Sequence, residues 1–220
     1  MSTGSARTTR LVQLALLSAI LFIMGFTPLG SFPLPGSPIV ATLAQIPVVI
    51  GALLLGTRSG AFLGGVFGFV SLLWFTIYGG SPVIPTAFVF SPFYSVNLAQ
   101  GNLLLAAWYA VCSLLICFGP RILIGVVSGK VYQKLMAKTH SVSKSAMVAG
   151  VCGSLTNTIL VLLGILLFFA TPYAEANGSQ VIWGLLGASI LFNGIPEAIV
   201  TPLITAAVVT PLSKLQRRAG

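Results

Sequence analysis

Two charged side chains, Arg121 and Glu197, lie inside long apolar stretches of the sequence. A charge in such surroundings is costly, so each is a candidate for function. The planar guanidinium of arginine can bind both oxygens of a carboxylate, which would let Arg121 hold an anionic ligand. Alternatively, Arg121 and Glu197 neutralise each other, or Arg121 extends to the membrane interface. The residues alone leave these alternatives open.

Several amide and aromatic side chains accompany these charges. Asn193 precedes Glu197 by four residues, so the two share one helix face. Lone amides often bridge helices, but several near one opening indicate a polar pocket. Aromatic rings in the loop before Arg121 would close over the apolar part of a ligand. The candidate substrate-binding residues are Arg121, Asn97, Asn157, Asn193, Glu197, Phe93, Tyr94 and Gln45.

The sequence contains no arrangement of residues that is typical of an enzyme. It has no nucleophile elbow, zinc-binding helix or ATP-binding loop. With two acidic residues in the whole chain, a carboxylate pair for acid–base catalysis is nearly excluded. The cysteines Cys112, Cys117 and Cys152 lack metal-ligand spacing. We therefore expect neither an enzyme nor a metal site, and no cofactor in this chain.

The composition predicts a membrane protein. Hydrophobic residues make up 56% of the chain and charged residues 6%, whereas soluble domains carry about 25% charged residues. The net charge of +9 comes from clusters that flank the apolar stretches, which is typical of cytoplasmic loops rather than of a nucleic-acid partner. We expect one all-α domain, residues 1–220, integrated in the cell membrane by several passes through the bilayer.

We predict six transmembrane helices with elaborated outer loops. The outer loops are 27–38, 79–102 and 171–180, which are rich in Pro, Ser, Gly or aromatic residues. The last helix should be broken or kinked near Pro196 and Pro202. The expected helices occupy 11–26, 39–55, 60–77, part of 103–136, 146–170 and much of 181–212.

The segment 103–136 allows more than one interpretation. As one helix it would be about 51 Å long, more than the ~30 Å of a hydrocarbon core, and Gly119-Pro120-Arg121 divides it. Two crossings here would place Lys130–Lys144 outside, whereas one crossing keeps these lysines and both termini in the cytoplasm. Six spans therefore fit better. Residues 103–118 would then be re-entrant, interfacial or steeply tilted on the outer side. Arg121 and Glu197 would fall in the outer half of the membrane.

Small residues recur at a spacing of four along three expected helices. Glycines do so in 60–68 and in 125–129, where they should let helices of this chain pack closely. Ala15 and Ala19 repeat the pattern on the first helix. An exposed stripe there could dock a helix of another protein.

Taken in order, these segments resemble one family. The chain is similar to the substrate-binding S-component of energy-coupling-factor (ECF) vitamin transporters. Segments Phe90–Tyr94 and Cys117–Arg121 look most like its pantothenate-type members. The motifs that carry the resemblance are Ala15–Ala19, Ile46–Gly56 with Gly60–Gly68, Pro120–Gly125, Gly153–Thr158 and Asn193–Glu197.

The resemblance implies that substrate binding and ATP hydrolysis belong to different subunits. An S-component binds a vitamin from outside with high affinity, then docks on a transmembrane T-component that carries two cytoplasmic ATPases. ATP would be used by those partners, and Ala15 and Ala19 would form the docking motif. If the vitamin is pantothenate, Arg121 would bind its carboxylate, and Asn97, Asn157 and Asn193 its hydroxyl and amide groups.

Other functions remain open at this stage. Another vitamin, such as folate, cobalamin or riboflavin, could be the substrate. The chain could instead be a stand-alone secondary carrier for a small polar metabolite, although no convincing internal repeat is visible. A membrane scaffold whose outer loops bind a partner protein is a third alternative.

Overall fold

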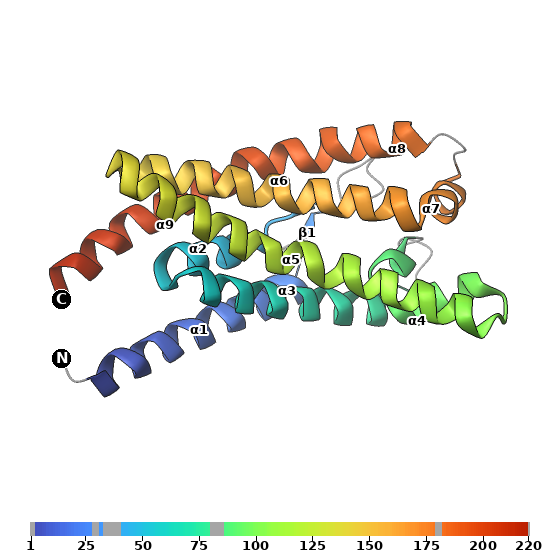
Figure 1. The fold of residues 1–220 in the computed structure, drawn as a ribbon, viewed down its shortest axis with the longest axis horizontal. Coiled ribbons are helices and arrows are strands. Elements are labelled where there is room, and N and C mark those ends of the chain that lie inside the picture. Colours follow the sequence, from blue (N-terminus) through green and yellow to red (C-terminus); the bar gives the residue numbers. More distant parts are fainter. Residues whose placement is uncertain (1–2, 28–30, 33–40, 80–85, 179–181, 220) are drawn as a thin grey trace.

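The computed structural model describes residues 3–27, 31–32, 41–79, 86–178 and 182–219. They form an elongated helical bundle with both ends of the chain at one end of the molecule (Figure 1). The helices of the bundle are α1 (Thr3–Phe26), α2 (Gln45–Leu55), α3 (Thr57–Tyr78), α5 (Leu103–Thr139), α6 (Val142–Phe168), α8 (Ile182–Ser189) and α9 (Ile195–Ala219). The short elements are η1 (Ala87–Val89), α4 (Pro92–Ser95), η2 (Val96–Ala99), α7 (Ala170–Ala176), the π-helical turn η3 (Ile190–Gly194), and the strands β1 (Ser31–Phe32) and β2 (Ala41–Thr42), which pair antiparallel.

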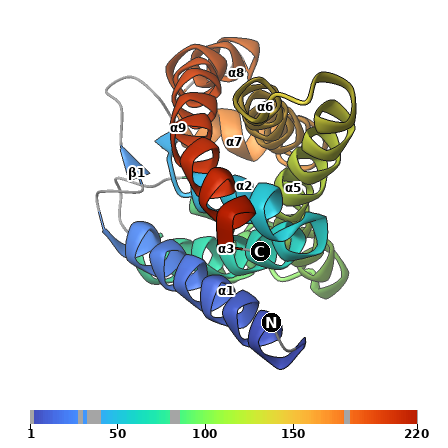
Figure 2. The same cartoon turned by 90° about the vertical axis from the view of Figure 1, so that its left-hand side faces the viewer.

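The short helix α2 lies at the centre of the bundle. It contacts α1, α3, α5, α6 and α9, and the end-on view shows it among them (Figure 2). Residues Gln45–Leu53 are all buried. Around it, the helices follow one another in the order α1, α3, α5, α6 and α9, each in contact with the next. The bundle is therefore built on a central half-length helix, which places the first residue of α2, Gln45, in its interior.

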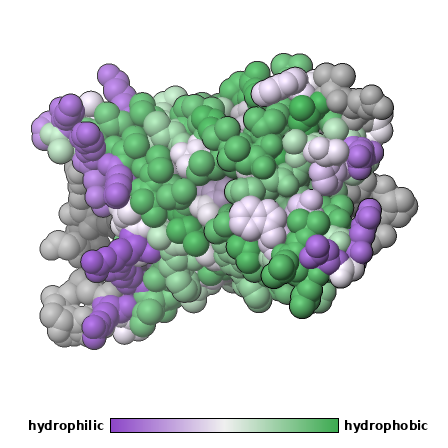
Figure 3. Space-filling model, turned by 45° about the vertical axis from the view of Figure 1, so that its right-hand side comes forward, coloured by the Kyte–Doolittle hydropathy of each residue, from purple (hydrophilic) through white to green (hydrophobic). Residues whose placement is uncertain are grey.

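The surface of the bundle matches a bilayer. Hydrophilic residues gather at the two ends of the face in Figure 3, and hydrophobic residues cover the region between them. Within the described residues, five helices are long and apolar enough to cross a membrane: Arg7–Phe26, Thr57–Tyr78, Leu103–Thr139, Val142–Phe168 and Ile182–Leu215. The all-α membrane fold predicted from the sequence is confirmed.

The second predicted helix, 39–55, is shorter than expected. Its helical part is α2 with 11 residues, or about 16 Å. Residues 41–42 form strand β2 instead, and 39–40 fall outside the described residues. The helix begins at Gln45 because Pro47 fits the first turn, where a backbone N–H has no partner within the helix.

The segment 103–118 belongs to one continuous helix, α5, of 37 residues. Its start is fixed by Asn102, whose side chain accepts hydrogen bonds from the amides of Leu104 and Leu105 at 3.1 and 3.2 Å. The helix runs through Pro120 to Thr139. At about 55 Å it exceeds the thickness of a hydrocarbon core. Of the alternatives that the sequence left open, the structure shows a single helix, which can tilt in the bilayer or extend beyond its core.

The last span is interrupted, as predicted, just before Pro196. The five residues of η3 form a π-helical turn, in which the amide of Ile195 bonds to the carbonyl of Ile190. Pro196 has no amide hydrogen to continue the α-helical pattern, so the register shifts at this point. Pro202, by contrast, lies within the continuous helix α9. The α-helix is thus interrupted before Pro196 and unbroken at Pro202.

The described outer loops contain helical turns. Residues 86–99 form η1, α4 and η2 in succession, and α7 occupies much of the 171–180 segment. Thr76 and Ser91 share a hydrogen bond of 2.8 Å between their hydroxyl oxygens, which joins this region to α3. Residues 28–30, 33–38, 80–85 and 179–180 of the predicted loops fall outside the described residues.

Glycines bring α3 and α5 into backbone contact, as their spacing predicts. A side chain at Gly125 would collide with the backbone of Gly60, and one at Gly64 would collide with the backbone of Arg121. A Cβ at Gly68 would lie 2.8 Å from the ring of Phe118. The internal packing function of the two glycine stripes is confirmed. The close approach at Gly64 also fixes where the backbone of Arg121 lies.

Candidate substrate-binding site

Arg121 is a buried cation held by one carbonyl and two aromatic rings. Its side chain is 6% exposed. Nη1 donates a 2.8 Å hydrogen bond to the carbonyl oxygen of Ile116. The guanidinium carbon lies 4.7 Å from the ring centre of Phe90 and 5.7 Å from that of Phe67. Both distances fall within the range of cation–π interactions. The arginine is thus oriented before any ligand arrives.

The ring of Phe90 is held in place by a second aromatic ring. Its ring stacks on Phe75 of α3, with ring centres 4.6 Å apart and planes 26° apart. The ring thus lies against Arg121 and is supported by α3 through Phe75. The loop segment 86–99, through Phe90, is therefore coupled to the arginine on α5.

A second group of buried polar side chains surrounds Gln45. Its Nε2 lies 2.9 Å from Oγ1 of Thr201, 3.3 Å from Oγ of Ser154 and 3.4 Å from a carboxylate oxygen of Glu197. All four residues are at most 5% exposed. Helices α2, α6 and α9 thus contribute polar groups to one place in the interior. The distances indicate that the bond to Thr201 is the strongest of the three.

The packing of α6 against the last span brings Asn157 close to this group. A Cβ at Gly150 would lie 2.7 Å from Pro202, and one at Gly194 would lie 2.9 Å from Thr158. Because the two helices are antiparallel, these two contacts place Asn157 beside the stretch from Asn193 to Glu197. Asn157 is 8% exposed and Asn193 is 5% exposed. The amides that the sequence singled out are therefore gathered between α6 and α9.

Arg121 and Glu197 lie far from the ends of the helical segments that carry them. Arg121 is the central residue of α5, with 18 residues of the helix on either side (103–120 and 122–139). Glu197 follows the π-helical turn within the Ile182–Leu215 span. Both charges are therefore near the middle of the helical segments that carry them. The interactions described above hold Arg121 through Ile116, Phe67 and Phe90, and Glu197 through Gln45.

Three buried polar atoms of these groups have no hydrogen-bond partner among the described residues: Oε1 of Gln45, Nε of Arg121 and Oδ1 of Asn157. An unmade hydrogen bond on a buried polar group costs about 1–3 kcal/mol. A polar ligand would satisfy these atoms. On α7, at the end of the bundle opposite the termini, Tyr173 is fully buried (Figure 1). Burial raises the pKa of Tyr173 to about 12, so its hydroxyl stays protonated.

Comparison with known proteins identifies the family. Residues 96–213 match the model of the family described as "ECF transporter, substrate-specific component". The chain is 37% identical over 185 residues to the pantothenic acid transporter PanT of Lactococcus lactis subsp. cremoris, covering 83% of this chain and 82% of that protein. The chain belongs to the substrate-specific components of ECF transporters. It is therefore a substrate-binding transporter subunit in the membrane and not an enzyme.

Two further similarities agree with this assignment. The pantothenate transporter PanT of Leuconostoc mesenteroides subsp. mesenteroides is 27% identical over 217 residues, covering 97% of this chain and 93% of that protein. The fold resembles the crystal structure of the S-component for biotin from an ECF-type ABC transporter. That similarity has a TM-score of 0.59 at 17% identity and covers 97% of this chain and 95% of that one. It shows a shared S-component fold.

Three of the candidate residues lie away from the buried polar group in this S-component. Phe93 is 70% exposed, and Asn97 is exposed as well. Tyr94 is half-buried, and its hydroxyl donates a 3.2 Å hydrogen bond to the carbonyl of Thr76. The structure therefore does not bring Phe93 or Asn97 to Arg121. The aromatic ring that contacts the arginine is Phe90, at the other end of the same motif.

Sequence reasoning also missed other residues of the site. Phe67 lies between two members of the glycine stripe on α3, and its position next to Gly68 gave no sign of contact with Arg121. Ser154 and Thr201 are common residue types in membrane helices. The spacing of four residues between Glu197 and Thr201, which places them on one helix face, is the signal that could have found Thr201.

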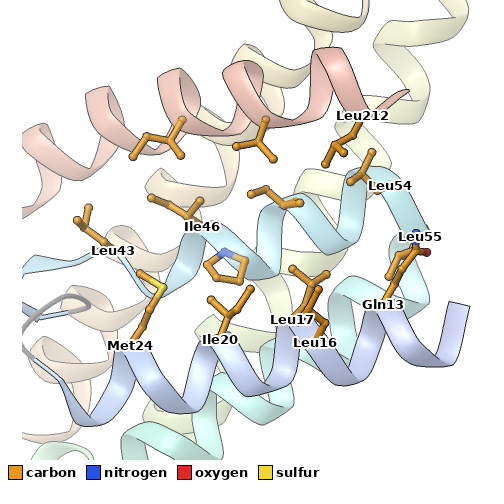
Figure 4. A pocket seen from close by; sticks show the side chains of 14 residues that line it. Gln13, Leu16, Leu17, Ile20, Met24, Leu43, Ile46, Leu54, Leu55 and Leu212 are labelled. Atoms are coloured by element: carbon orange, nitrogen blue, oxygen red, sulfur yellow. The ribbon is translucent and has the colours of Figure 1, made fainter. Parts of the chain in front are cut away.

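An apolar groove on the S-component is separate from this site. It has a volume of about 580 Å³ and lies between α1, α2 and α9 (Figure 4). Leucine and isoleucine side chains dominate its lining, and Gln13 is the polar side chain in it. Such a lining does not suit a polar vitamin. Ala15 and Ala19 do not line this groove and are exposed on α1.

Proposed function

We propose that this S-component binds pantothenate and delivers it to an ECF transporter. Two relatives named for pantothenic acid or pantothenate transport support this choice. The chemistry of the site agrees with it, since pantothenate carries a carboxylate, an amide, two hydroxyls and an apolar dimethyl group. A binding site for it needs one cation, several hydrogen-bonding groups and an apolar wall.

Arg121 is the observation that carries the proposal. It is a buried charge whose direct partners are a neutral carbonyl and two rings. An uncompensated buried charge is destabilising. A ligand carboxylate would supply the missing negative charge and could engage Nε, which has no partner among the described residues. Phe67 and Phe90 would form the apolar wall beside it.

The rest of the ligand would lie towards the polar group between α2, α6 and α9. We assign the hydroxyl and amide groups of pantothenate to Gln45, Asn157, Asn193 and Glu197. The unsatisfied oxygens of Gln45 and Asn157 can accept hydrogen bonds from ligand hydroxyls or the amide N–H. Such a site discriminates strongly, because an analogue lacking these groups leaves buried polar atoms unpaired. Phe93 and Asn97 would reach the ligand only if the loop moved.

We further propose that the loaded subunit docks on a T-component with two ATPases through α1. Ala15 and Ala19 are exposed on its surface, and small residues at this spacing allow close helix approach in lipid. ATP hydrolysis by the partners would then tilt the S-component and release the vitamin inward. In this arrangement the basic end of the molecule, with both termini, faces the cytoplasm.

The test is a binding experiment on the purified protein in detergent. Isothermal titration calorimetry with pantothenate and with panthenol, the alcohol that replaces its carboxylate, measures the contribution of the charge. We expect wild-type protein to prefer pantothenate, and Arg121→Gln to lose most of that preference. Loss of a hydrogen bond to a charged group is worth ~1.5–3 kcal/mol, or roughly 10- to 150-fold in affinity.

A panel of riboflavin, folate, cobalamin and biotin serves as the comparison. Lys130→Gln, on the exposed face of the same helix, is the matched control for loss of one positive charge. Tight binding of another vitamin with none of pantothenate would show that the substrate is different. Equal affinity for pantothenate and panthenol in the wild type would remove the assigned role of Arg121.

A further inference from the structure

A second cationic site lies at the end of the bundle that carries both termini. A hollow of about 360 Å³ between α1 and α3 is lined by Arg7, Arg10, Leu11, Leu14, Arg58, Ser59 and Phe62. Three of these residues are arginines and three are large apolar residues. The hollow shares no lining residue with the groups that contact Arg121 or Gln45. It is therefore independent of the vitamin site.

The polar and apolar parts of the hollow are arranged along the helix axes. On α1, Arg7 is followed by Leu11 and then Leu14, which share a face. On α3, Arg58 is followed by Phe62 one turn further along. In both helices the arginine is nearer the end of the span and the apolar residue nearer its middle. Leu11 is 64% exposed and Phe62 is 57% exposed, so the apolar walls face the lipid.

Arg10 gives the hollow a fixed positive group. Its Nη2 donates a 2.8 Å hydrogen bond to Oγ of Ser59 and a 3.1 Å hydrogen bond to the carbonyl of Leu55. Leu55 is the last residue of α2, so the arginine also satisfies a carbonyl at the helix end. These two bonds hold the guanidinium between α1 and the α2–α3 turn. Arg7 and Arg58 line the same hollow and are exposed.

No acidic side chain of this chain can neutralise the three arginines. The whole sequence contains two acidic residues, Glu175 and Glu197. Glu175 is on α7, at the opposite end of the bundle from the termini (Figure 1). Glu197 is buried beside Gln45 in the interior. A group that neutralises Arg7, Arg10 and Arg58 must therefore come from outside the chain.

We propose that this hollow binds an anionic glycerophospholipid of the surrounding leaflet. The lipid phosphate would lie among Arg7, Arg10 and Arg58, because guanidinium groups bind phosphate oxygens in pairs. One acyl chain would run along Leu11, Leu14 and Phe62 towards the middle of the membrane. A lipid fits better than an acidic protein segment because the apolar walls are continuous with the lipid-facing surface. The bound lipid would tie the end of α1 to the α2–α3 turn.

Native mass spectrometry of the protein in neutral detergent tests this proposal. Phosphatidylglycerol and phosphatidylcholine of identical acyl chains are titrated against wild-type protein and against Arg7→Gln/Arg58→Gln. Arg10 is left in place because it holds the α2 end. We expect wild-type protein to retain phosphatidylglycerol in preference to phosphatidylcholine. Each basic residue near an anionic lipid contributes roughly a fivefold gain in affinity, so the double variant should bind phosphatidylglycerol about 25-fold more weakly.

The matched control is Lys138→Gln/Lys144→Gln, which removes the same charge from exposed residues outside the hollow. It should change phosphatidylglycerol affinity less than twofold. A competition arm adds soluble glycerol 3-phosphate, which lacks acyl chains and should displace the lipid only at large excess. Equal loss in the control, phosphatidylcholine binding as tight as phosphatidylglycerol, or displacement by equimolar glycerol 3-phosphate would each overturn the proposal.

Discussion

The guanidinium of Arg121 is hydrogen-bonded to the carbonyl of Ile116 at 2.8 Å, across five residues of the same helix. In an uninterrupted α-helix that carbonyl would accept from the amide of residue 120. Residue 120 is proline, which has no amide hydrogen, so the acceptor is left over. The side chain of Arg121 donates its hydrogen bond to this free carbonyl. Pro120 and Arg121 thus act together: the proline frees a carbonyl within the span, and the adjacent arginine is oriented by it.

Replacing Pro120 with alanine should therefore separate folding from binding. The new amide would bond to the Ile116 carbonyl and compete with Arg121. We expect the melting temperature to stay the same or rise, because proline inside a helix costs about 3 kcal/mol relative to alanine. Pantothenate affinity should fall roughly 5- to 10-fold, the scale of one lost hydrogen bond. Calorimetry and thermal unfolding measure both effects. A less stable protein with wild-type affinity would contradict the positioning role.

A double-mutant cycle on Arg121 and Glu197 distinguishes a ligand site from a structural charge pair. Because Arg121 donates to the carbonyl of Ile116 and Glu197 accepts from Gln45, we expect Arg121→Gln to change stability little. The coupling energy between Arg121→Gln and Glu197→Gln in thermal unfolding should be below about 0.5 kcal/mol. If Arg121→Gln is strongly destabilising and Glu197→Gln restores the loss, the two residues serve mainly to neutralise each other.

The glycine stripe of α3 offers a test of the packing that places Arg121. A side chain at Gly64 would collide with the Arg121 backbone, whereas one at the adjacent Gly65 would meet nothing within 4 Å. Gly64→Ala should lower stability by roughly 1–3 kcal/mol, the usual cost of overpacking, and weaken pantothenate binding. Gly65→Ala should leave both properties near wild type. Similar behaviour of the two variants in thermal unfolding would show that the α3–α5 contact is not as close as described.

The docking role of α1 predicts an assembly defect without a binding defect. Ala15→Trp with Ala19→Trp should block close approach of a partner helix while the isolated subunit still binds pantothenate. Co-purification with the T-component and ATPases, together with vitamin uptake in proteoliposomes, measures assembly and transport. Leu163→Trp, at an exposed apolar position on α6, is the control. Normal assembly and uptake by the double tryptophan variant would show that the partner docks elsewhere.

The orientation in the membrane can be measured by cysteine labelling. In a background lacking Cys112, Cys117 and Cys152, single cysteines at Ser141 and at Glu175 lie at opposite ends of the bundle. With basic residues inside, an impermeant maleimide should label intact cells at position 175 and not at position 141. Labelling of position 141 from outside would reverse the proposed orientation of the termini.

Local patterns in the sequence already determine much of this protein. The near absence of charge requires a non-aqueous environment, and long apolar segments with basic flanks require helices that cross it. The glycine spacing predicts the close contact of α3 with α5, because small residues at a spacing of four lie on one helix face. Arg121 and Glu197 also stand out in the sequence, because a charge within an apolar segment needs a partner or a function.

Tertiary packing determined which of the candidate site residues contact one another. Gln45 joins Ser154 and Thr201 because α2 is short and central, and its length depends on where the chain before it turns. Phe90 contacts Arg121 while Phe93 faces outward, although the two rings are three residues apart in one motif. No periodicity distinguishes them, since helical turns in 86–99 set their directions. The continuity of α5 through Pro120 was likewise decided by its neighbours. Gly64 brings α3 against the helix there, and the Arg121 side chain satisfies the carbonyl that the proline leaves free.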